Sequence, residues 1–264
     1  MSVEIIVCVK QIPTVRTLSI DPRAGALKRE SVPGVINQED LCALEEALLL
    51  KEKHGGKVTA LSMGPPQAEI MLREALAMGV NRAILLCDRA FAGSDTLATS
   101  HVLAQAIRKL GNYDLILCGK QTADGSTGQV GPELAELLDL PQVTSTQRLE
   151  VSLQRVVAER TLDSSLQLVE TRLPALITVT RSINKPRPVS VDAIIIACRE
   201  MEVTVWKADD LGIEKSSVGL LGSATRMASA CPSPPKKRAG EMLEGTTGEV
   251  VKMLLERLRK QGVI

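Results

Sequence analysis

A loop rich in glycine and hydroxyl side chains follows an apolar run near the middle of the chain. The apolar run is Leu115–Cys118, and the loop contains Gly125, Ser126, Thr127 and Gly128, with a helix-like segment after it. The backbone N–H groups of such a loop and the positive end of the helix dipole together attract phosphate and other anions. The pattern therefore predicts a nucleotide site; the alternative interpretation is an ordinary turn that uses glycine for its geometry.

Asp124 and Pro132 lie on either side of these small residues. A carboxylate repels a phosphate, so we expect Asp124 to bond a ribose hydroxyl or to cap the loop. Proline fits best in the first turn of a helix, which places the helix start near Gly131. The chain has no GxxxxGK[ST] sequence and no GxGxxG after its first strand, which excludes a P-loop ATPase and the common dinucleotide fold.

Residues at other strand ends are further candidates, because ligands of open α/β sheets lie beyond the carboxyl ends of the strands. These residues are Cys8, Val9 and Lys10, then Ser62, Met63 and Gly64, then Cys87, Asp88 and Arg89. Asn37 and Asp40 begin the first helix and are placed to reach a ligand, although Asn37 is equally suited to be a plain N-cap. No side chain has the pattern of a general acid or base, so we expect no catalytic residue.

A basic loop with two prolines, Arg181–Ser190, also has two interpretations. It is either a solvated connection or a docking loop, because proline lowers the entropy cost of ordering a loop on a partner. In the docking interpretation, Val189 or Val191 is the apolar anchor.

Strands and helices alternate regularly through the first half of the chain. We expect strands at Val3–Val9, Lys57–Ser62, Ala83–Cys87 and Leu115–Cys118, and helices at Gln38–Lys53, Gln67–Met78 and Ser94–Leu110. The long excursion Gln11–Gly34 has room for a small hairpin. The alternation predicts an α/β fold with a mostly parallel, doubly wound, Rossmann-like sheet.

The alternation of strands and helices stops after Pro141. Strand-like segments follow without helices between them, at Val143–Val151, Arg155–Arg160, Leu166–Thr171 and Ala175–Thr180. Their pattern predicts an antiparallel portion of the sheet, at an edge or in a lobe over it.

From about Arg199 onward the pattern is typical of an extended arm that ends in a helix. The prolines of Cys231–Arg238 exclude a helix or a central strand there, and Thr247–Lys260 has the pattern of an amphipathic helix. We therefore expect a nucleotide-binding α/β domain over residues 1–200 and a C-terminal arm over residues 201–264. The apolar side of the terminal helix must either fold back on its own domain or dock on a partner chain.

The composition excludes several classes of protein. Lys and Arg total 32 and Asp and Glu total 31, a balance that gives no sign of binding to nucleic acid or to a membrane surface. No apolar run is long enough to span a bilayer. The six cysteines are scattered without a CxxC pair and the two histidines lie apart, so we expect reduced thiols in a cytoplasmic protein and no metal site. Any redox chemistry must then come from a cofactor.

Several segments resemble the β subunit of electron transfer flavoprotein, in register over essentially the whole chain. They are VCVKQIP, INQEDLCALEEAL, ALSMGPPQAEIMLREALAMGVNRAIL, LILCGKQTADGSTGQVGPELAELLDLPQVT, NKPRPV and EMLEG. The resemblance implies a heterodimer with an α subunit, in which electrons pass to or from acyl-CoA dehydrogenases through FAD. It also implies that the redox FAD common to the family is held mainly by the α subunit, and that the C-terminal arm docks on that subunit.

The resemblance further implies a nucleotide site on the β subunit itself. The implied cofactor-binding residues are Cys8, Val9, Asn37, Gln38, Asp40, Ser62, Met63, Gly64, Thr122, Ala123, Asp124, Gly125, Ser126, Thr127, Gly128, Gln129 and Val130. The implied partner-docking residues are Asn184, Pro186, Arg187, Val189 and Val191. The leucine that anchors this docking loop in the family is absent, and Val191 lies nearby.

Two branches of the family differ at the nucleotide site. The conventional branch holds structural AMP, and its loop carries an acidic run before Asn-Gln-Thr-Gly-Gln. The electron-bifurcating branch holds a second FAD, which takes hydride from NADH, and its loop reads DGxTxQVGP. The present loop, Asp124–Pro132, is similar to the second pattern, with Ser126 in place of an acid. We therefore expect FAD at this loop, NADH as electron donor, and ferredoxin or flavodoxin as a low-potential acceptor.

Two alternatives remain open from the sequence. One is a conventional β subunit with AMP, which serves as a scaffold and docking surface. The other is a stand-alone adenine-nucleotide-binding regulatory module, which would need neither the proline-rich arm nor the terminal helix.

Overall fold

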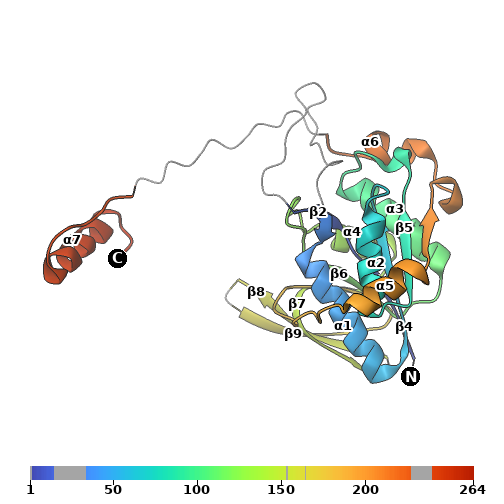
Figure 1. Cartoon of the computed structure of the whole chain (residues 1–264), viewed down its shortest axis with the longest axis horizontal. Helices are drawn as coiled ribbons and strands as arrows, with labels where there is room; N and C mark the ends of the chain where they lie inside the picture. Colours follow the sequence, from blue (N-terminus) through green and yellow to red (C-terminus); the bar gives the residue numbers. More distant parts are fainter. Residues whose placement is uncertain (1, 15–33, 153, 164, 227–239) are drawn as a thin grey trace. The chain divides into compact units, whose positions relative to one another are not determined.

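The computed structural model describes residues 2–14, 34–152, 154–163, 165–226 and 240–264. The chain divides into two compact units, Met1–Ala228 and Ser229–Ile264. The first unit is built on one large sheet with helices on both of its faces (Figure 1).

Nine strands form this sheet in the order β11-β5-β4-β1-β6-β10-β7-β8-β9. Neighbouring strands run parallel from β11 to β7, and β7, β8 and β9 pair antiparallel at one edge. The mostly parallel sheet with an antiparallel portion, predicted from the sequence, is therefore confirmed. The strands are β1 (Val3–Cys8), β4 (Gly56–Met63), β5 (Arg82–Leu86), β6 (Leu115–Gly119), β7 (Gln142–Ser152), β8 (Arg155–Leu162), β9 (Ser165–Arg172), β10 (Ala175–Val179) and β11 (Val203–Trp206).

The order of the strands places a topological switch between β1 and β6. The chain runs outward from β1 through β4 and β5, and then returns to β6 on the other side of β1. In doubly wound sheets the ligand crevice lies beyond the carboxyl ends of the strands at such a switch. The loop after β6 starts at this point.

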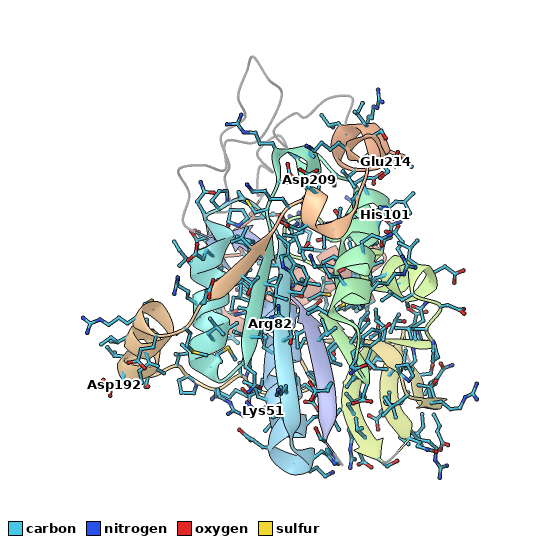
Figure 2. All side chains as sticks on the ribbon, turned by 90° about the vertical axis from the view of Figure 1, so that its right-hand side faces the viewer. Lys51, Arg82, His101, Asp192, Asp209 and Glu214 are labelled. Atoms are coloured by element: carbon cyan, nitrogen blue, oxygen red, sulfur yellow. The ribbon has the colours of Figure 1, made fainter. Side chains whose placement is uncertain are left out.

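Helices form a layer on each face of the sheet. On one face, Leu44, Met71 and Ala197 join α1, α2 and α5 to a core shared with the strands. On the other face, Ile107 and Leu134 join α3 and α4 to a second core. Figure 2 shows the helix that carries Asp192 and the helix that carries His101 on opposite sides of the sheet. The helices are α1 (Gln38–His54), α2 (Ala68–Met78), α3 (Thr96–Leu110), α4 (Val130–Leu137), α5 (Val191–Arg199) and the short α6 (Gly219–Gly222).

Burial on both faces explains why the central strands have apolar sequences without alternation. All five residues of β10 are buried. The edge strand β9, in contrast, is largely exposed, and its Leu166 and Leu168 are 63% and 74% exposed. The change of pattern after Pro141 therefore marks the place where the sheet extends beyond its helices.

The long excursion after β1 begins and ends in a small antiparallel pair. β2 (Gln11–Pro13) pairs with β3 (Gly34–Ile36), so the two ends of the excursion lie side by side. Most of the excursion, residues 15–33, lies outside the described residues.

The compact unit continues further along the chain than the sequence suggests. β11 pairs in parallel with β5 and forms the second edge of the sheet. Trp206 lies at the end of β11. The Lys109 ammonium lies 4.6 Å from the centroid of its ring, and the Arg82 guanidinium lies 5.7 Å from the same centroid. Both are cation–π distances. β11 and the segment that follows it belong to the first unit, which extends to Ala228.

The described part of the second unit contains α7 (Thr247–Lys260), with the bounds that the sequence predicts. Thr246 and Glu249 form a capping box at its start. Val251, Leu254 and Leu255 are exposed, so this helix presents apolar surface. Within the part of the chain that the structure describes, no helix is both long and apolar enough to cross a bilayer.

Candidate functional site

The loop between β6 and α4 turns through two left-handed residues. Gly128 has φ +64° and Ser126 has φ +52°. The N–H of Ser126 donates to the carbonyl of Thr122 over 2.8 Å, which closes the turn. A Cβ on Gly125 would meet Thr122 Oγ1 at 3.4 Å, an ordinary contact. The backbone therefore favours glycine at position 128, where φ is left-handed, more than at position 125.

This loop presents unused backbone donors. The N–H groups of Gly125, Thr127 and Gly128 donate to no acceptor within the described ranges. Gln129 precedes α4 and makes no side-chain cap, so the positive end of this helix is also open. Free donors on a loop and on the helix end that follows it are the features that the sequence predicts for an anion cradle.

Asn37 attaches the base of the loop to the start of α1. Its Nδ2 donates to the carbonyl of Gln121 over 2.9 Å, and its Oδ1 accepts from the N–H of Ala123 over 3.3 Å. Glu39 accepts from the N–H of Gln121 over 2.8 Å. Asn37 occupies the N-cap position of α1 but makes no side-chain cap, and it is only 1% exposed, so its side chain positions the loop instead of capping the helix.

Asp40 joins the ends of β1 and β6. Its carboxylate accepts from the N–H of Lys10 over 2.8 Å and from the N–H of Gly119 over 3.1 Å. A Cβ on Gly119 would lie 2.2 Å from Asp40 Oδ1, so glycine is required for this approach. Burial raises the pKa of Asp40 from 3.8 to about 7, against the opposing effect of these hydrogen bonds. Asp40 thus holds the strand ends rather than reaching outward.

Asp124 forms an ion pair with Lys10. Lys10 Nζ lies 2.8 Å and 2.9 Å from the two carboxylate oxygens. The pair neutralises the one acidic side chain of the loop tip, which would otherwise repel an anion.

The ends of β1 and β4 supply the remaining predicted residues. Cys8 and Val9 are buried. Ser62 is 1% exposed, and its Oγ has no hydrogen-bond partner among the described residues. A buried hydroxyl without a partner is costly unless a ligand or water satisfies it. Together with the free N–H groups and the neutralised Asp124, it fits the polar requirements of a nucleotide.

The predicted docking loop is fastened to α1. Arg187 pairs with Glu45 over 2.9 Å and with Glu52 over 2.6 Å. Asn184 donates to Glu46 over 2.9 Å and to the carbonyl of Cys42 over 3.0 Å. Asn184 and Arg187 therefore fix the loop within the chain.

The sequence interpretation missed α5, which follows this loop. The Ser190 side chain accepts from the N–H of Ala193 over 3.2 Å and caps the helix. A serine before an apolar run is the signal that could have revealed it. Val191 is 73% exposed, and Ile194, Ile195 and Ile196 are also exposed. The apolar anchor of a docking surface is therefore available on α5, whereas Val189 packs against the core.

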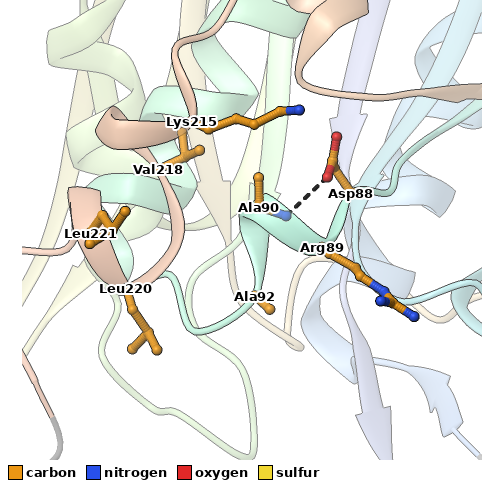
Figure 3. Close-up of a pocket in the computed structure, with 8 residues that line it drawn as sticks. All are labelled: Asp88, Arg89, Ala90, Ala92, Lys215, Val218, Leu220 and Leu221. Atoms are coloured by element: carbon orange, nitrogen blue, oxygen red, sulfur yellow. Dashed lines mark hydrogen bonds between the residues drawn. The ribbon is translucent and has the colours of Figure 1, made fainter.

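A cavity of about 490 Å³ lies at the carboxyl end of β5 (Figure 3). Its lining combines Asp88, Arg89 and Lys215 with apolar residues such as Leu220 and Leu221. Asp88 accepts from the N–H of Ala90 over 2.9 Å, and this bond lowers the pKa of Asp88 more than any other interaction. Asp88 and Arg89 thus line this cavity, and no residue of the Thr122–Val130 loop does.

Comparisons with known proteins agree along nearly the whole chain. Residues 24–211 match the electron transfer flavoprotein domain. The electron transfer flavoprotein subunit beta of Thermoanaerobacterium thermosaccharolyticum is 46% identical over 260 residues, which cover 98% of this chain and 99% of the relative. The caffeyl-CoA reductase-Etf complex subunit CarD of Acetobacterium woodii is 41% identical, and the acryloyl-CoA reductase electron transfer subunit gamma of Anaerotignum propionicum is 42% identical, each with the same coverage. The chain therefore belongs to the electron transfer flavoprotein family, as a β-type subunit that serves electron transfer.

Proposed function

We propose that this chain is the β subunit of an electron-bifurcating electron transfer flavoprotein, with FAD at the Thr122–Val130 loop. The observation that carries the proposal is the loop itself. Gly125, Thr127 and Gly128 offer free N–H donors, and Lys10 neutralises Asp124. A pyrophosphate carries two adjacent negative groups, so it needs several donors and no unpaired carboxylate nearby.

FAD, when bound, would accept electrons from NADH and divide them between the FAD of the α subunit with its dehydrogenase and a low-potential acceptor such as ferredoxin or flavodoxin. The chain's own residues bind and orient. The free N–H groups and the end of α4 would hold the pyrophosphate, and the Ser62 hydroxyl would bond a polar atom of the cofactor. Asn37 and Asp40 keep the loop and strand ends in place.

The partners follow from the two apolar surfaces. The exposed residues of α5, from Val191 to Ile196, would dock an acyl-CoA dehydrogenase-type flavoenzyme, and α7 would dock on the α subunit. The names of two relatives, which refer to caffeyl-CoA and acryloyl-CoA reductases, support a partner that acts on acyl-CoA thioesters. We place the complex in the cytoplasm.

The decisive experiment is to copurify the chain with its α subunit and count the flavins in each heterodimer. Two FAD molecules, both bleached by NADH, are expected. One FAD with one AMP would contradict the proposal and support the conventional form, and a monomer that binds adenine nucleotide without flavin would support a regulatory module.

A pair of glycine variants tests the placement of the cofactor. Gly128→Val puts a β-branched side chain at φ +64° and should empty the β-subunit site. Gly125→Ala is the matched control, because its added Cβ makes only an ordinary contact. Unchanged flavin content in Gly128→Val would refute the placement of the pyrophosphate at this loop.

A further inference from the structure

Two buried thiols meet at the strand ends that support the loop site. Cys8 and Cys118 are register partners on the neighbouring parallel strands β1 and β6, and they are 8% and 5% exposed. Both side chains belong to the core between the sheet and α3. The sequence predicts no thiol pair, because the two cysteines lie far apart along the chain and only the strand register brings them together.

The geometry of the pair suits a disulfide. Neighbouring strands are about 4.8 Å apart, which lies within the Cα separations of about 4.4–6.8 Å that a disulfide bridges. The side chains also interact directly, since contact with the Cys8 thiol, followed by burial, raises the pKa of the Cys118 thiol well above its ordinary value. A bond between the sulfurs is therefore within reach of the pair, although it requires a shift of the two strand ends.

The same two strand ends are held by Asp40. Its carboxylate accepts from the N–H of Lys10, shortly after Cys8, and from the N–H of Gly119, next to Cys118. A disulfide would shorten the distance between the sulfurs from a contact distance to about 2.05 Å. This change would draw the strand ends together and displace the donors that Asp40 binds. Lys10 also holds Asp124 of the loop, so the displacement would reach the anion cradle.

We propose that Cys8 and Cys118 form a reversible dithiol–disulfide pair, oxidised by a hydroperoxide, that controls anion binding by the Thr122–Val130 loop. The Cys8 sulfur attacks the peroxide; an S–O bond forms, the O–O bond breaks, and water leaves when hydrogen peroxide is the oxidant. The Cys118 sulfur then attacks the resulting sulfenic acid; the S–S bond forms, the S–O bond breaks, and a second water leaves. Two electrons pass from the sulfurs to the peroxide, and both thiol protons end in water.

Cys8 is assigned the first step because it is the more exposed of the two thiols, at 8% against 5%, and the raised pKa of Cys118 agrees with this order. A bridge between adjacent parallel strands is expected to be strained and therefore readily reduced by a dithiol. The control of the loop rests on the proposed function, whereas the formation of the disulfide does not.

The first experiment treats the full chain with hydrogen peroxide, alkylates the remaining thiols and identifies the peptides by mass spectrometry. We expect a Cys8–Cys118 crosslink with the loss of two hydrogen atoms, reversed by dithiothreitol. Cys8→Ser and Cys118→Ala should each abolish this crosslink. Cys42→Ser is the matched control, because Cys42 is equally buried at 4% exposed and lies on α1. Sulfinic acid at Cys8 or Cys118, or disulfides formed only through other cysteines, would overturn the proposal.

The second experiment measures ADP binding by calorimetry before and after oxidation. We expect about tenfold weaker binding by the oxidised chain, the effect of losing roughly one hydrogen bond to a charged group, and recovery after reduction. Peroxide should leave the affinity of Cys118→Ala unchanged. Equal affinity in both redox states of the wild-type chain would refute the control of the loop. No ADP binding in either state would refute the proposed site and its control together, while the peptide experiment still decides whether the disulfide forms.

Discussion

Replacement of Arg187 by alanine should destabilise the first unit by about 2–3 kcal/mol. Three donors of Arg187 meet Glu45: the backbone N–H at 3.0 Å, Nε at 2.9 Å and Nη2 at 3.0 Å. The Glu45 side chain is 6% exposed and that of Arg187 is 31% exposed. Removing one partner of a fully buried pair costs about 3–5 kcal/mol, because the other charge is left without compensation. The expected cost is lower here because water reaches Arg187 and the backbone N–H remains.

The measurement is urea unfolding followed by the fluorescence of Trp206, which is the only tryptophan. A cost of this size should also lower the melting temperature by roughly 5–10 °C for a unit of about this length. The double variant Arg187→Ala/Glu45→Ala should recover part of the lost stability, since it removes the uncompensated carboxylate.

A matched control comes from an ion pair on the antiparallel edge. Arg155 and Glu170 lie 2.8 Å apart, but their side chains are 64% and 54% exposed. The same double-mutant cycle there should give at most about 0.5 kcal/mol. Equal coupling energies in the two cycles, or a cost of less than about 0.5 kcal/mol for Arg187→Ala, would refute the argument that burial makes the Arg187 pair important.

Other variants test the loop cradle and its base. Asn37→Ala should remove the hydrogen bonds to the backbone of Gln121 and Ala123. The rate of amide hydrogen exchange in the loop should then rise, and the global free energy of unfolding should fall by about 1–3 kcal/mol. An unchanged exchange rate would show that the loop keeps its conformation without Asn37. Lys10→Met should weaken ADP binding about tenfold, because the loop loses the Lys10 ammonium that lies 2.8 Å from the Asp124 carboxylate, and adding Asp124→Asn should restore affinity; a failure of this rescue would contradict the electrostatic explanation. The Asp40 carboxyl has a pKa of about 7 in the folded chain and of 3.8 in the reference state. Between these two pH values the folded chain binds more protons than the unfolded chain. The free energy of unfolding should therefore fall as pH rises through this window, by up to about 4 kcal/mol. Unfolding measured at pH 5 and pH 8 should show about 2.6 kcal/mol of this loss in the wild-type chain and none in Asp40→Asn.

The sequence predicted the features that depend on local periodicity. The alternation of strands and helices gave the mixed sheet, and the bounds of α7 followed from its apolar spacing. β11 was missed because its four residues are too few to carry a distinct pattern outside the sheet. α5 was missed because its exposed isoleucines follow a proline-rich loop that dominated the interpretation of that region.

The position of the candidate site was predictable, but its internal contacts were not. Gly128 follows from the need for a left-handed residue in the turn. The pairing of Asp124 with Lys10, and of Cys8 with Cys118, depends on strand register and on the meeting of distant segments. Asn37 occupies the position of an N-cap, and only the loop that lies against it reveals its different role.

The attachment of the loop base to α1 has a consequence for how this family can diversify. Asn37, Glu39 and Asp40 hold Gly119, Gln121 and Ala123, whereas the tip from Gly125 to Gly128 is exposed or only partly buried and lies outside both cores. The base of the loop can therefore stay constant while the residues of the tip are substituted. A switch from one bound nucleotide to another would then require a few substitutions in the tip and no redesign of the sheet.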